Sequence, residues 1–428
     1  MPSDFDDNSP EQAGLPARRA ALAMLDAVLR RGQTLDAAAQ GSAARLPPAD
    51  RALALAIAGE TMRRLPDLDA LIDSATARAL PEDSKARTVL RLALAQKWAM
   101  EVPDHALVAT ALPLVDGGPR RLVHGVLGTL LRRGLPPLDT PNLPEAVHHR
   151  WTAAWGDDVV EAARRQIATR PALDLSFADP AAATAFAQAN DGTQLATRHV
   201  RLAATGAIPD LPGFDEGGWW VQDLAATLPA RLIPRVAKTV LDLCAAPGGK
   251  TLQLAAAGHT VTALDRAQSR LKRLSDNLRR THLTAATVTA DALTYAGGPY
   301  DAVLLDAPCS STGTFRRHPE VLHRASARII ASSAELQQAL LARAASLVAP
   351  GGTLVYAVCS LEPAEGERVI DQFLATTRDF TLAPPTDADP DWPATIPADP
   401  RGWVRVLPGL LEAEGGLDGF FLARLVRS

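Results

Sequence analysis

The stretch Val240–Thr251 reads VLDLCAAPGGKT and decides the fold of the C-terminal half of the chain. Its first five residues form a short apolar run, which predicts a β-strand. Gly248 and Gly249 follow in a turn that leads into a helix. Glycines at such a turn let the backbone approach a ligand closely, and the start of a helix favours negative charge such as a carboxylate. The stretch therefore predicts a strand, a ligand-binding turn and a helix.

Further apolar runs of strand length follow, mostly separated by helical stretches. They are Val261–Asp265, Ala286–Ala290, Ala302–Asp306 and Thr353–Val358. This alternation predicts a doubly wound, largely parallel sheet, that is, a Rossmann-like α/β domain over residues 236–428. The carboxyl ends of parallel strands face the ligand crevice in such a sheet.

Acidic side chains stand at two of these strand ends. Asp265 lies 16 residues after Gly249 and can hydrogen-bond the ribose hydroxyls of a nucleotide-like cofactor. Asp291 follows the third run and can hold an adenine amino group. Each signal is weak alone, because an aspartate often caps the next helix.

Two cysteines follow two other strands. Cys309 lies in DAPCSSTG (306–313), and Cys359 lies in YAVCS (356–360). If these strands are neighbours, both thiols face one crevice, and the spacing accepts either as a nucleophile. A buried structural role is the alternative. A metal site is disfavoured, because the three cysteines of the chain form no CxxC motif and have no nearby histidines.

The run Gly249-Lys250-Thr251 also invites a phosphate-binding-loop interpretation. That motif requires glycine where Cys244 stands, and Pro247 removes a backbone N–H that would hold phosphate. We therefore disfavour a nucleotide hydrolase.

The N-terminal part of the chain lacks the alternation of strands and helices that is found in residues 236–428. Residues 16–135 carry apolar side chains at helical spacing and few β-branched residues, which predicts an all-α domain. Residues 136–144 are proline-rich and predict a linker, and residues 145–235 predict a small α+β domain. We expect residues 1–15 to be a disordered leader.

Composition narrows the class of protein. The 428 residues are too many for one ordinary domain, and no long apolar run predicts a membrane span. The N-terminus has no secretory signal, and three cysteines favour a reducing cytoplasm over a disulfide framework. A net charge of −4 argues against a generic polyanion binder, so RNA binding would need a localised basic face.

Taken together, the motifs resemble the NOL1/NOP2/Sun family of RNA cytosine-5 methyltransferases. Residues 16–135 are similar to a NusB-like RNA-binding domain, with Arg120–Leu127 resembling its last helix, which narrows the resemblance to the bacterial Sun type. The resemblance spans nearly the whole chain and is strongest from Val221 to Gly366. It implies S-adenosyl-L-methionine as cofactor and RNA, probably 16S ribosomal RNA, as substrate. We expect no membrane association, no obligate protein partner and a monomer.

The resemblance also implies roles for individual residues. Cys359 would be the nucleophile, Cys309 would help release the product, and Asp306 would lie beside the methionine part and the target base. Asp265 would bind the ribose, and Asp291 would bind the adenine. The remaining expected cofactor residues are Cys244, Ala245, Ala246, Pro247, Gly248, Gly249 and Lys250, of which Lys250 also helps to position catalytic groups.

The sequence departs from the family pattern at Val358, which replaces threonine, at Ser311, which replaces glycine, and at His124, which replaces asparagine. Arg316-Arg317-His318 predicts either an RNA-backbone contact or an exposed basic turn. The motifs disfavour two rival functions. One is a DNA cytosine-5 methyltransferase with Cys309 as nucleophile, and the other is a ribosome-assembly factor that has lost activity.

Overall fold

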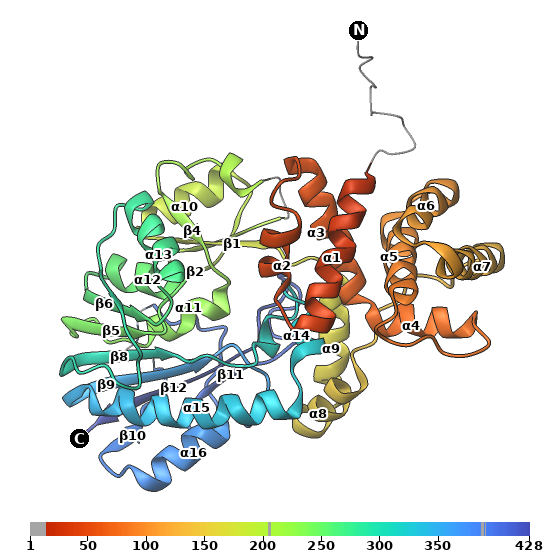
Figure 1. Ribbon diagram of the computed structural model, residues 1–428. Helices are drawn as coiled ribbons and strands as arrows, with labels where there is room; N and C mark the ends of the chain where they lie inside the picture. The colour runs from red at the N-terminus through yellow and green to blue at the C-terminus, as the bar shows by residue number, and fades with distance from the viewer. Residues whose placement is uncertain (1–13, 204–206, 387–388, 390) are drawn as a thin grey trace. The chain divides into compact units, whose positions relative to one another are not determined.

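The chain folds into two compact units (Figure 1). A computed structural model describes residues 14–203, 207–386, 389 and 391–428. The first unit runs to Arg150 and includes His318–Arg324, and the second comprises Trp151–Arg317 with Ala325–Ser428. The expected leader lies outside the described residues except for Gly14 and Leu15, where the first helix begins.

The described residues of the first unit form helices and no strands, which confirms the prediction. Its elements are α1 (Leu15–Arg31), α2 (Leu35–Ser42), α3 (Pro48–Arg63), α4 (Leu65–Ser74), α5 (Lys85–Met100), α6 (Asp104–Ala111), η1 (Leu112–Leu114), α7 (Gly117–Arg133) and α14 (Val321–Arg324). Helix α5 is central, because every residue from Ala86 to Gln96 is buried. A helix that is buried all round needs neighbours on each side, and α1, α3, α4, α6 and α7 supply them.

The last part of the first unit comes from far along the sequence. Glu320 Oε1 accepts a hydrogen bond from the backbone N–H of Leu35, at 3.0 Å, at the start of α2. His323 Nε2 lies 3.0 Å from the carbonyl oxygen of Met62, and Arg324 Nε donates to the carbonyl of Gly32 at 2.8 Å. Burial lowers the pKa of His323 to about 4, so its ring stays neutral and donates from Nε2.

The second unit contains a small antiparallel sheet in the order β2-β3-β1-β4. Its strands are β1 (Leu173–Phe177), β2 (Thr193–Ala196), β3 (His199–Leu202) and β4 (Trp219–Val221). The accompanying helices are α9 (Asp157–Ala168), α10 (Pro180–Ala189), η2 (Ile208–Asp210) and α11 (Leu224–Arg231), while α8 (Glu145–Trp155) spans the boundary at Arg150.

The same unit contains a larger sheet in the order β10-β12-β9-β8-β5-β6-β7, with β11 paired to β12. Its strands are β5 (Thr239–Leu243), β6 (Thr260–Asp265), β7 (Ala286–Thr289), β8 (Tyr300–Asp306), β9 (Val348–Val358), β10 (Phe380–Leu382), β11 (Val404–Val406) and β12 (Phe420–Arg427). Strands β5 to β9 are parallel, as predicted. Strands β10, β11 and β12 are antiparallel additions that the sequence analysis did not anticipate.

Helices cover both faces of this sheet (Figure 1). They are α12 (Gly249–Ala256), α13 (Gln268–Arg280), η3 (Thr312–Thr314), α15 (Ala327–Ser346) and α16 (Glu367–Thr376). Successive residues of β8 serve opposite faces: Val303 and Leu305 pack in the cluster with α15 and α16, while Ala302 and Leu304 pack in the cluster with α11. The chain leaves β5 for β6 on one side and returns to β8 on the other, so the sheet's switch point lies between β5 and β8.

The structure divides the chain differently from the sequence-based boundaries. Residues 145–235 were expected to form a domain of their own, but from Trp151 onward they belong to the same compact unit as the large sheet. Arg201 of β3 explains part of this union, because it donates to the carbonyl oxygens of Glu414 and Gly416 near the C-terminus, both at 2.8 Å. Contacts of this kind link segments more than 200 residues apart and are not readable from local pattern.

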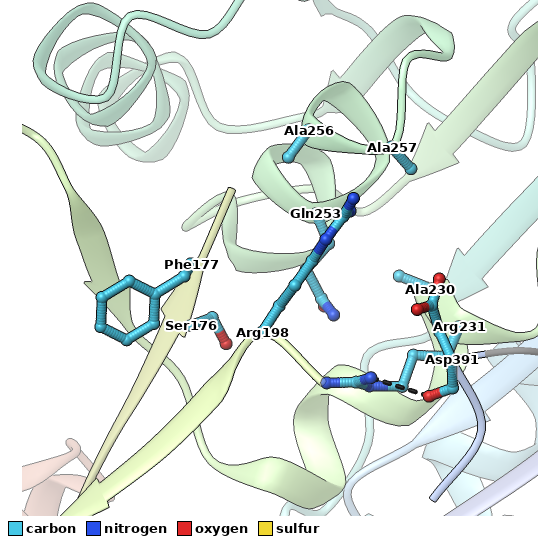
Figure 2. A pocket seen from close by; sticks show the side chains of 9 residues that line it. All are labelled: Ser176, Phe177, Arg198, Ala230, Arg231, Gln253, Ala256, Ala257 and Asp391. Carbon is cyan, nitrogen blue, oxygen red and sulfur yellow. Dashed lines mark hydrogen bonds between the residues drawn. The ribbon is translucent and has the colours of Figure 1, made fainter. Parts of the chain in front are cut away.

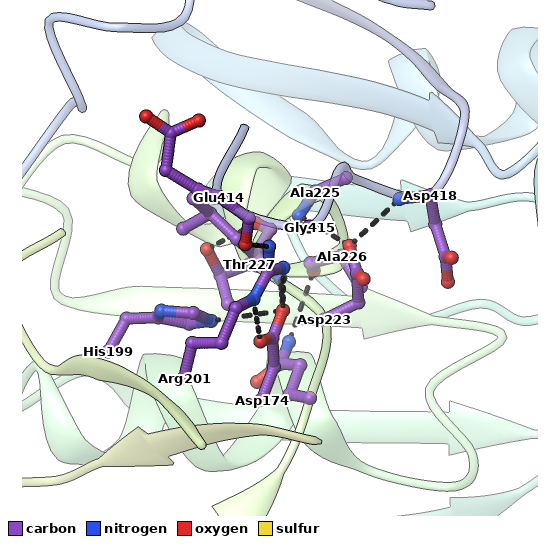
Figure 3. A network of polar contacts seen from close by, with 12 residues as sticks. Asp174, His199, Arg201, Asp223, Ala225, Ala226, Thr227, Glu414, Gly415 and Asp418 are labelled. Carbon is purple, nitrogen blue, oxygen red and sulfur yellow. Dashed lines mark hydrogen bonds and ion pairs between the residues drawn. The ribbon is translucent and has the colours of Figure 1, made fainter. Parts of the chain in front are cut away.

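A buried network of charges joins these segments (Figure 3). Asp174 is fully buried and accepts two hydrogen bonds from Arg201, at 2.6 and 2.7 Å, while His199 Nε2 lies 3.5 Å from its carboxylate. Arg317 donates to Asp223 at 2.5 Å and to Asp418 at 3.2 Å.

This network corrects the expectation for Arg316-Arg317-His318. Arg316 is only 2% exposed and donates to the carbonyl of Gly415 at 2.6 Å, and Arg317 is held by the two aspartates. Neither an exposed basic turn nor an RNA-backbone contact describes these two arginines. His318 belongs to the first unit and lies 3.7 Å from Glu320.

Replacing Asp174 with alanine is expected to lower the free energy of unfolding by about 3–5 kcal/mol, because Arg201 would stay buried without its counter-charge. Urea denaturation, followed by circular dichroism, measures the change. The control is Asp276→Ala, which removes an exposed ion pair with Arg279 and should cost less than about 1 kcal/mol. Equal losses for the two variants would contradict the prediction.

The same aspartate gives this stability a pH dependence. Burial alone would raise the pKa of Asp174, but Arg201 and His199 outweigh burial and lower the pKa below its usual 3.8. The contribution of Asp174 to stability is therefore fully present above pH 3.8 and is lost as the pH falls toward the lower folded-state pKa.

Candidate active site

Most of the predicted site residues line one cavity of about 340 Å³ in the second unit. It lies at the carboxyl ends of β5, β6 and β8. Eight of the expected residues line it: Cys244, Ala246, Pro247, Asp265, Asp291, Asp306, Cys309 and Cys359. This volume falls in the range of roughly 300–1,000 Å³ typical of small-molecule sites. The site therefore lies at the switch point, where a doubly wound sheet binds its ligand.

A second cavity in the same unit is far smaller, about 50 Å³, and is lined by Arg198, Arg231, Gln253 and Asp391 among others (Figure 2). Arg231 donates to the carbonyls of Asp391 and Thr197 and to the hydroxyl of Thr227. Its guanidinium thus holds three chain segments together, which describes a structural role.

The turn after β5 is shaped by backbone conformation. Gly248 has a φ of +112°, and a Cβ at this position would lie 2.8 Å from Cγ of Leu274, so only glycine fits. The backbone N–H of Ala245 donates to Leu264 at 3.0 Å, and that of Ala246 donates to Asp265 at 3.3 Å. Ala245, Gly248, Gly249 and Lys250 do not line the cavity themselves, and they shape or support the turn that does.

The two acids at strand ends are held differently. Asp265 is 2% exposed, and its carboxylate accepts hydrogen bonds from the backbone of Ala246 and Ala267 and lies 3.4 Å from Arg270. Asp291 is exposed and accepts one hydrogen bond from the backbone of Leu293, at 2.9 Å. The surrounding wall includes the apolar side chains of Leu264 and Leu340. Carboxylates beside an apolar wall fit a nucleoside, with ribose hydroxyls as donors and a base as the apolar part.

Cys309 and Cys359 meet at the wall of this cavity. Strands β8 and β9 are parallel neighbours, and Sγ of Cys309 lies 3.5 Å from Sγ of Cys359. The backbone N–H of Gly313 donates to the carbonyl of Cys359 at 3.1 Å, which fixes one loop to the other. Two strands that were predicted separately thus bring both thiols into one crevice.

The two thiols have different environments. The hydrogen bond from Cys309 lowers the pKa of Cys359, and Lys250 acts in the same direction, although burial and Asp306 oppose them. The bond with Cys359, followed by burial, raises the pKa of Cys309 well above that of an ordinary thiol. Cys359 is therefore the more acidic thiol of the pair. Burial raises the pKa of Cys244 to about 12, which keeps this third cysteine protonated.

Lys250 and Asp306 form an ion pair beside the thiols. Lys250 Nζ lies 2.7 Å from Asp306 Oδ2 and 5.2 Å from the ring centre of Phe420. Burial alone would lower the pKa of Lys250, but the charge and hydrogen bond of Asp306 outweigh burial and raise it. The ammonium group therefore supplies a fixed positive charge near Cys359.

The departures from the family pattern fall at three different kinds of position. Ser311 has a φ of +59°, a conformation that favours glycine. Val358 is fully buried in β9 opposite Phe421, and His124 is exposed on α7.

Other residues of the site carried no recognisable sequence signal. Leu336 and Leu340 of α15 line the cavity, and Glu365 and Gln337 form hydrogen bonds with the Cys309 loop.

Within the described part of the chain, no cluster of three or more His, Cys, Asp or Glu side chains is placed to hold a metal ion. None of the described helices has the length and apolar character of a membrane span.

Comparison with known proteins places this site in a family. Residues 229–426 match the family described as 16S rRNA methyltransferase RsmB/F, and residues 15–132 match the NusB family. The chain is 35% identical over 382 residues to ribosomal RNA small subunit methyltransferase B of Erwinia tasmaniensis, covering 81% of this chain and 84% of that protein. The protein of the same name from Xylella fastidiosa (strain Temecula1) is 34% identical over 365 residues, covering 81% and 82%.

Solved structures agree on the fold. The crystal structure of PH0851 covers 98% of this chain and 99% of its own, with a TM-score of 0.74 at 24% identity. NSun6 from Pyrococcus horikoshii covers 66% of this chain and 98% of its own, with a TM-score of 0.56 at 16% identity.

Together, the fold, the cavity and the family match define an S-adenosylmethionine-dependent methyltransferase, which confirms the predicted cofactor and enzyme class. The chain belongs to the ribosomal RNA small subunit methyltransferase B family. The predicted NusB-like helical part and Rossmann-like sheet are likewise confirmed.

Proposed function

We propose that this enzyme methylates C5 of a cytosine in 16S ribosomal RNA, with Cys359 as the nucleophile and Cys309 as the group that assists product release. The observation that carries the proposal is the 3.5 Å approach of the two sulfurs at the wall of the cofactor cavity. The names of the relatives and of the matching family support ribosomal RNA of the small subunit as the substrate.

S-adenosylmethionine would lie in the cavity with its ribose at Asp265 and its adenine at Asp291, and it supplies the methyl group. The turn from Cys244 to Lys250 would enclose it, and Asp306 would border both the methionine part and the target base. The cysteine loops lie at the edge of this cavity, so the base must be single-stranded or turned out of a helix to reach them.

The attack by Cys359 explains why a thiolate is needed. C5 of cytosine is a poor nucleophile, and a thiolate that bonds to C6 pushes electron density onto C5. C5 would then bond to the methyl carbon while the bond from that carbon to the sulfonium sulfur breaks and leaves a neutral thioether. Lys250 favours the thiolate form, because its positive charge lies close to Cys359. Asp306, held by Lys250, would hydrogen-bond the ring on its N3 side.

Release requires removal of the C5 proton, and Cys309 is suited to this step. The bond with Cys359 and its charge raise the pKa of Cys309, and both effects disappear once Cys359 is bound to carbon. Cys309 then loses its proton to water and accepts the C5 proton. The C6–S bond breaks, its electrons return to Cys359, and the ring regains its aromaticity.

RNA that contains 5-azacytidine tests the chemistry, because it traps a thiol bound at C6. Mass spectrometry of the trapped peptide should find Cys359. Attachment through Cys309 would instead indicate the mechanism of a DNA-type enzyme and overturn the assignment. Bisulfite sequencing of 16S ribosomal RNA from a deletion strain tests the substrate, and an unchanged methylation pattern would contradict it.

Binding of the cofactor can be tested separately. Replacing Asp265 with alanine should weaken S-adenosylmethionine binding by about 10–100-fold, because a charged hydrogen-bond acceptor for the ribose is lost. Isothermal titration calorimetry measures the dissociation constant. Asp276→Ala on the exposed side of α13 is the control, and a similar affinity for both variants would exclude Asp265 from the ribose site.

A further inference from the structure

Glu365 lies behind the two cysteine loops and is fully buried. Its side chain does not reach the cofactor cavity, and among the described residues no lysine, arginine or histidine forms an ion pair with it. A buried carboxylate without a counter-charge is costly unless hydrogen bonds satisfy it. Its hydrogen-bond partners therefore indicate what the residue does.

Those partners come from both cysteine loops. The backbone N–H of Ser310 donates to Oε1 of Glu365 at 2.8 Å, and the Ser310 hydroxyl donates to Oε2. The Ser360 hydroxyl donates to the same Oε2 at 2.5 Å. Ser310 follows Cys309, and Ser360 follows Cys359, so one carboxylate holds the residue after each thiol.

Two further contacts make this arrangement rigid. Gln337 of α15 donates from Nε2 to Glu365 Oε1 at 3.3 Å and to the carbonyl of Pro308 at 2.9 Å. The Tyr356 hydroxyl donates to the backbone carbonyl of Glu365 at 2.6 Å, which ties the glutamate to β9. Contacts with the sheet and with α15 therefore fix Glu365 independently of its contacts with the two cysteine loops.

We infer that Glu365 is the positioning residue that holds the Cys309 loop and the Cys359 loop at their reactive separation. The inference rests on the proposed function, in which one thiol attacks and the other assists release. Through Ser310 and Ser360, Glu365 sets the distance between the sulfurs without touching either. Its charge also raises the pKa of Cys309.

Two substitutions separate the position of the carboxylate from its charge. Glu365→Gln keeps the shape but replaces one acceptor oxygen with a donor, so the serine hydroxyls lose a shared acceptor. Glu365→Asp keeps the charge but is one methylene shorter. We expect each to lower kcat by about 100-fold with little change in KM, as misplacement of reacting groups by an ångström does.

The control is Glu362→Gln. Glu362 is also buried in this loop, but its carboxylate accepts a hydrogen bond from the Trp151 indole, at 3.1 Å, rather than from the serines that follow the cysteines. It should retain the wild-type kcat. A Glu365→Gln enzyme as active as this control would overturn the inference.

A second measurement requires neither RNA nor cofactor. Iodoacetamide alkylation across a pH series, with peptide mass spectrometry, measures the reactivity of each thiol. Wild-type protein should react first at Cys359, and Glu365→Gln should let Cys309 react at lower pH than in the wild type, because a nearby negative charge is gone. A merely structural role would lower stability and leave the ratio of the two alkylation rates unchanged.

These readouts keep the inference distinct from the proposed function. Trapping of Cys309 instead of Cys359 by azacytidine RNA would refute the proposed function, whereas unchanged alkylation in Glu365→Gln would refute the positioning role. If Glu365→Gln does not fold, Ser310→Ala and Ser360→Ala each remove one hydroxyl donor to the carboxylate and replace that variant in the kcat assay. A wild-type kcat in both serine variants would then overturn the inference.

Discussion

Replacing Cys359 with alanine is expected to lower the rate of methyl transfer by about 10⁴–10⁶-fold, the range seen when a covalent nucleophile is removed. Cys244 cannot replace it, because burial raises the pKa of Cys244 to about 12 and keeps that thiol protonated. Transfer of a radiolabelled methyl group to 16S ribosomal RNA measures the loss. The Cys359→Ala protein should still bind S-adenosylmethionine, since the acids that we propose to hold the cofactor are unchanged.

Cys309→Ala is the matched control, because it removes the neighbouring thiol and leaves the nucleophile in place. Loss of the covalent complex in Cys309→Ala together with its retention in Cys359→Ala would reverse the assignment. Cys359→Ser adds a further comparison, since a hydroxyl keeps the size of the side chain but lacks the acidity of a thiol.

The second large effect concerns release. Cys309→Ala should allow a single methyl transfer and then stop, because the C5 proton has lost its acceptor and the C6–S bond persists. A covalent complex between the protein and ordinary RNA, which contains no 5-azacytidine, should therefore accumulate and be visible on a denaturing gel. Steady-state turnover should fall by about 10²–10⁴-fold, the usual contribution of a general base. Turnover at the wild-type rate without an accumulating complex would show that another group removes the proton.

Much of the fold was predictable because its signals are local. The apolar runs that became β5 to β9 alternate with helices, and the glycines between Pro247 and Lys250 specify a turn. The proximity of the two thiols was predictable only conditionally, since it depends on β8 and β9 being neighbours. Strand order follows from contacts between distant segments, as the unanticipated strand β12 beside β9 also shows.

The burial of charged side chains was harder to predict from the sequence than the strands and helices were. Arg316 and Arg317 look like an exposed basic turn, and only the distant carboxylates of Asp223 and Asp418 explain why they are enclosed. Glu365 lies in the acid-rich segment Glu362–Glu367, which has the composition of a surface loop. Its partner Ser310 is 55 residues away, so no local pattern distinguishes it from its neighbours.

The excursion of His318–Arg324 into the helical unit has a consequence for how the protein is made. A nascent chain emerges from its N-terminus, so helices α1 to α7 are available early, but Glu320, His323 and Arg324 follow only after residues 151–317 have been synthesised. At about 5–20 residues per second, that delay is roughly 10–30 seconds. During translation the start of α2 lacks the carboxylate that accepts its backbone N–H, and the helical unit is completed only when the segment after the Cys309 loop has been made.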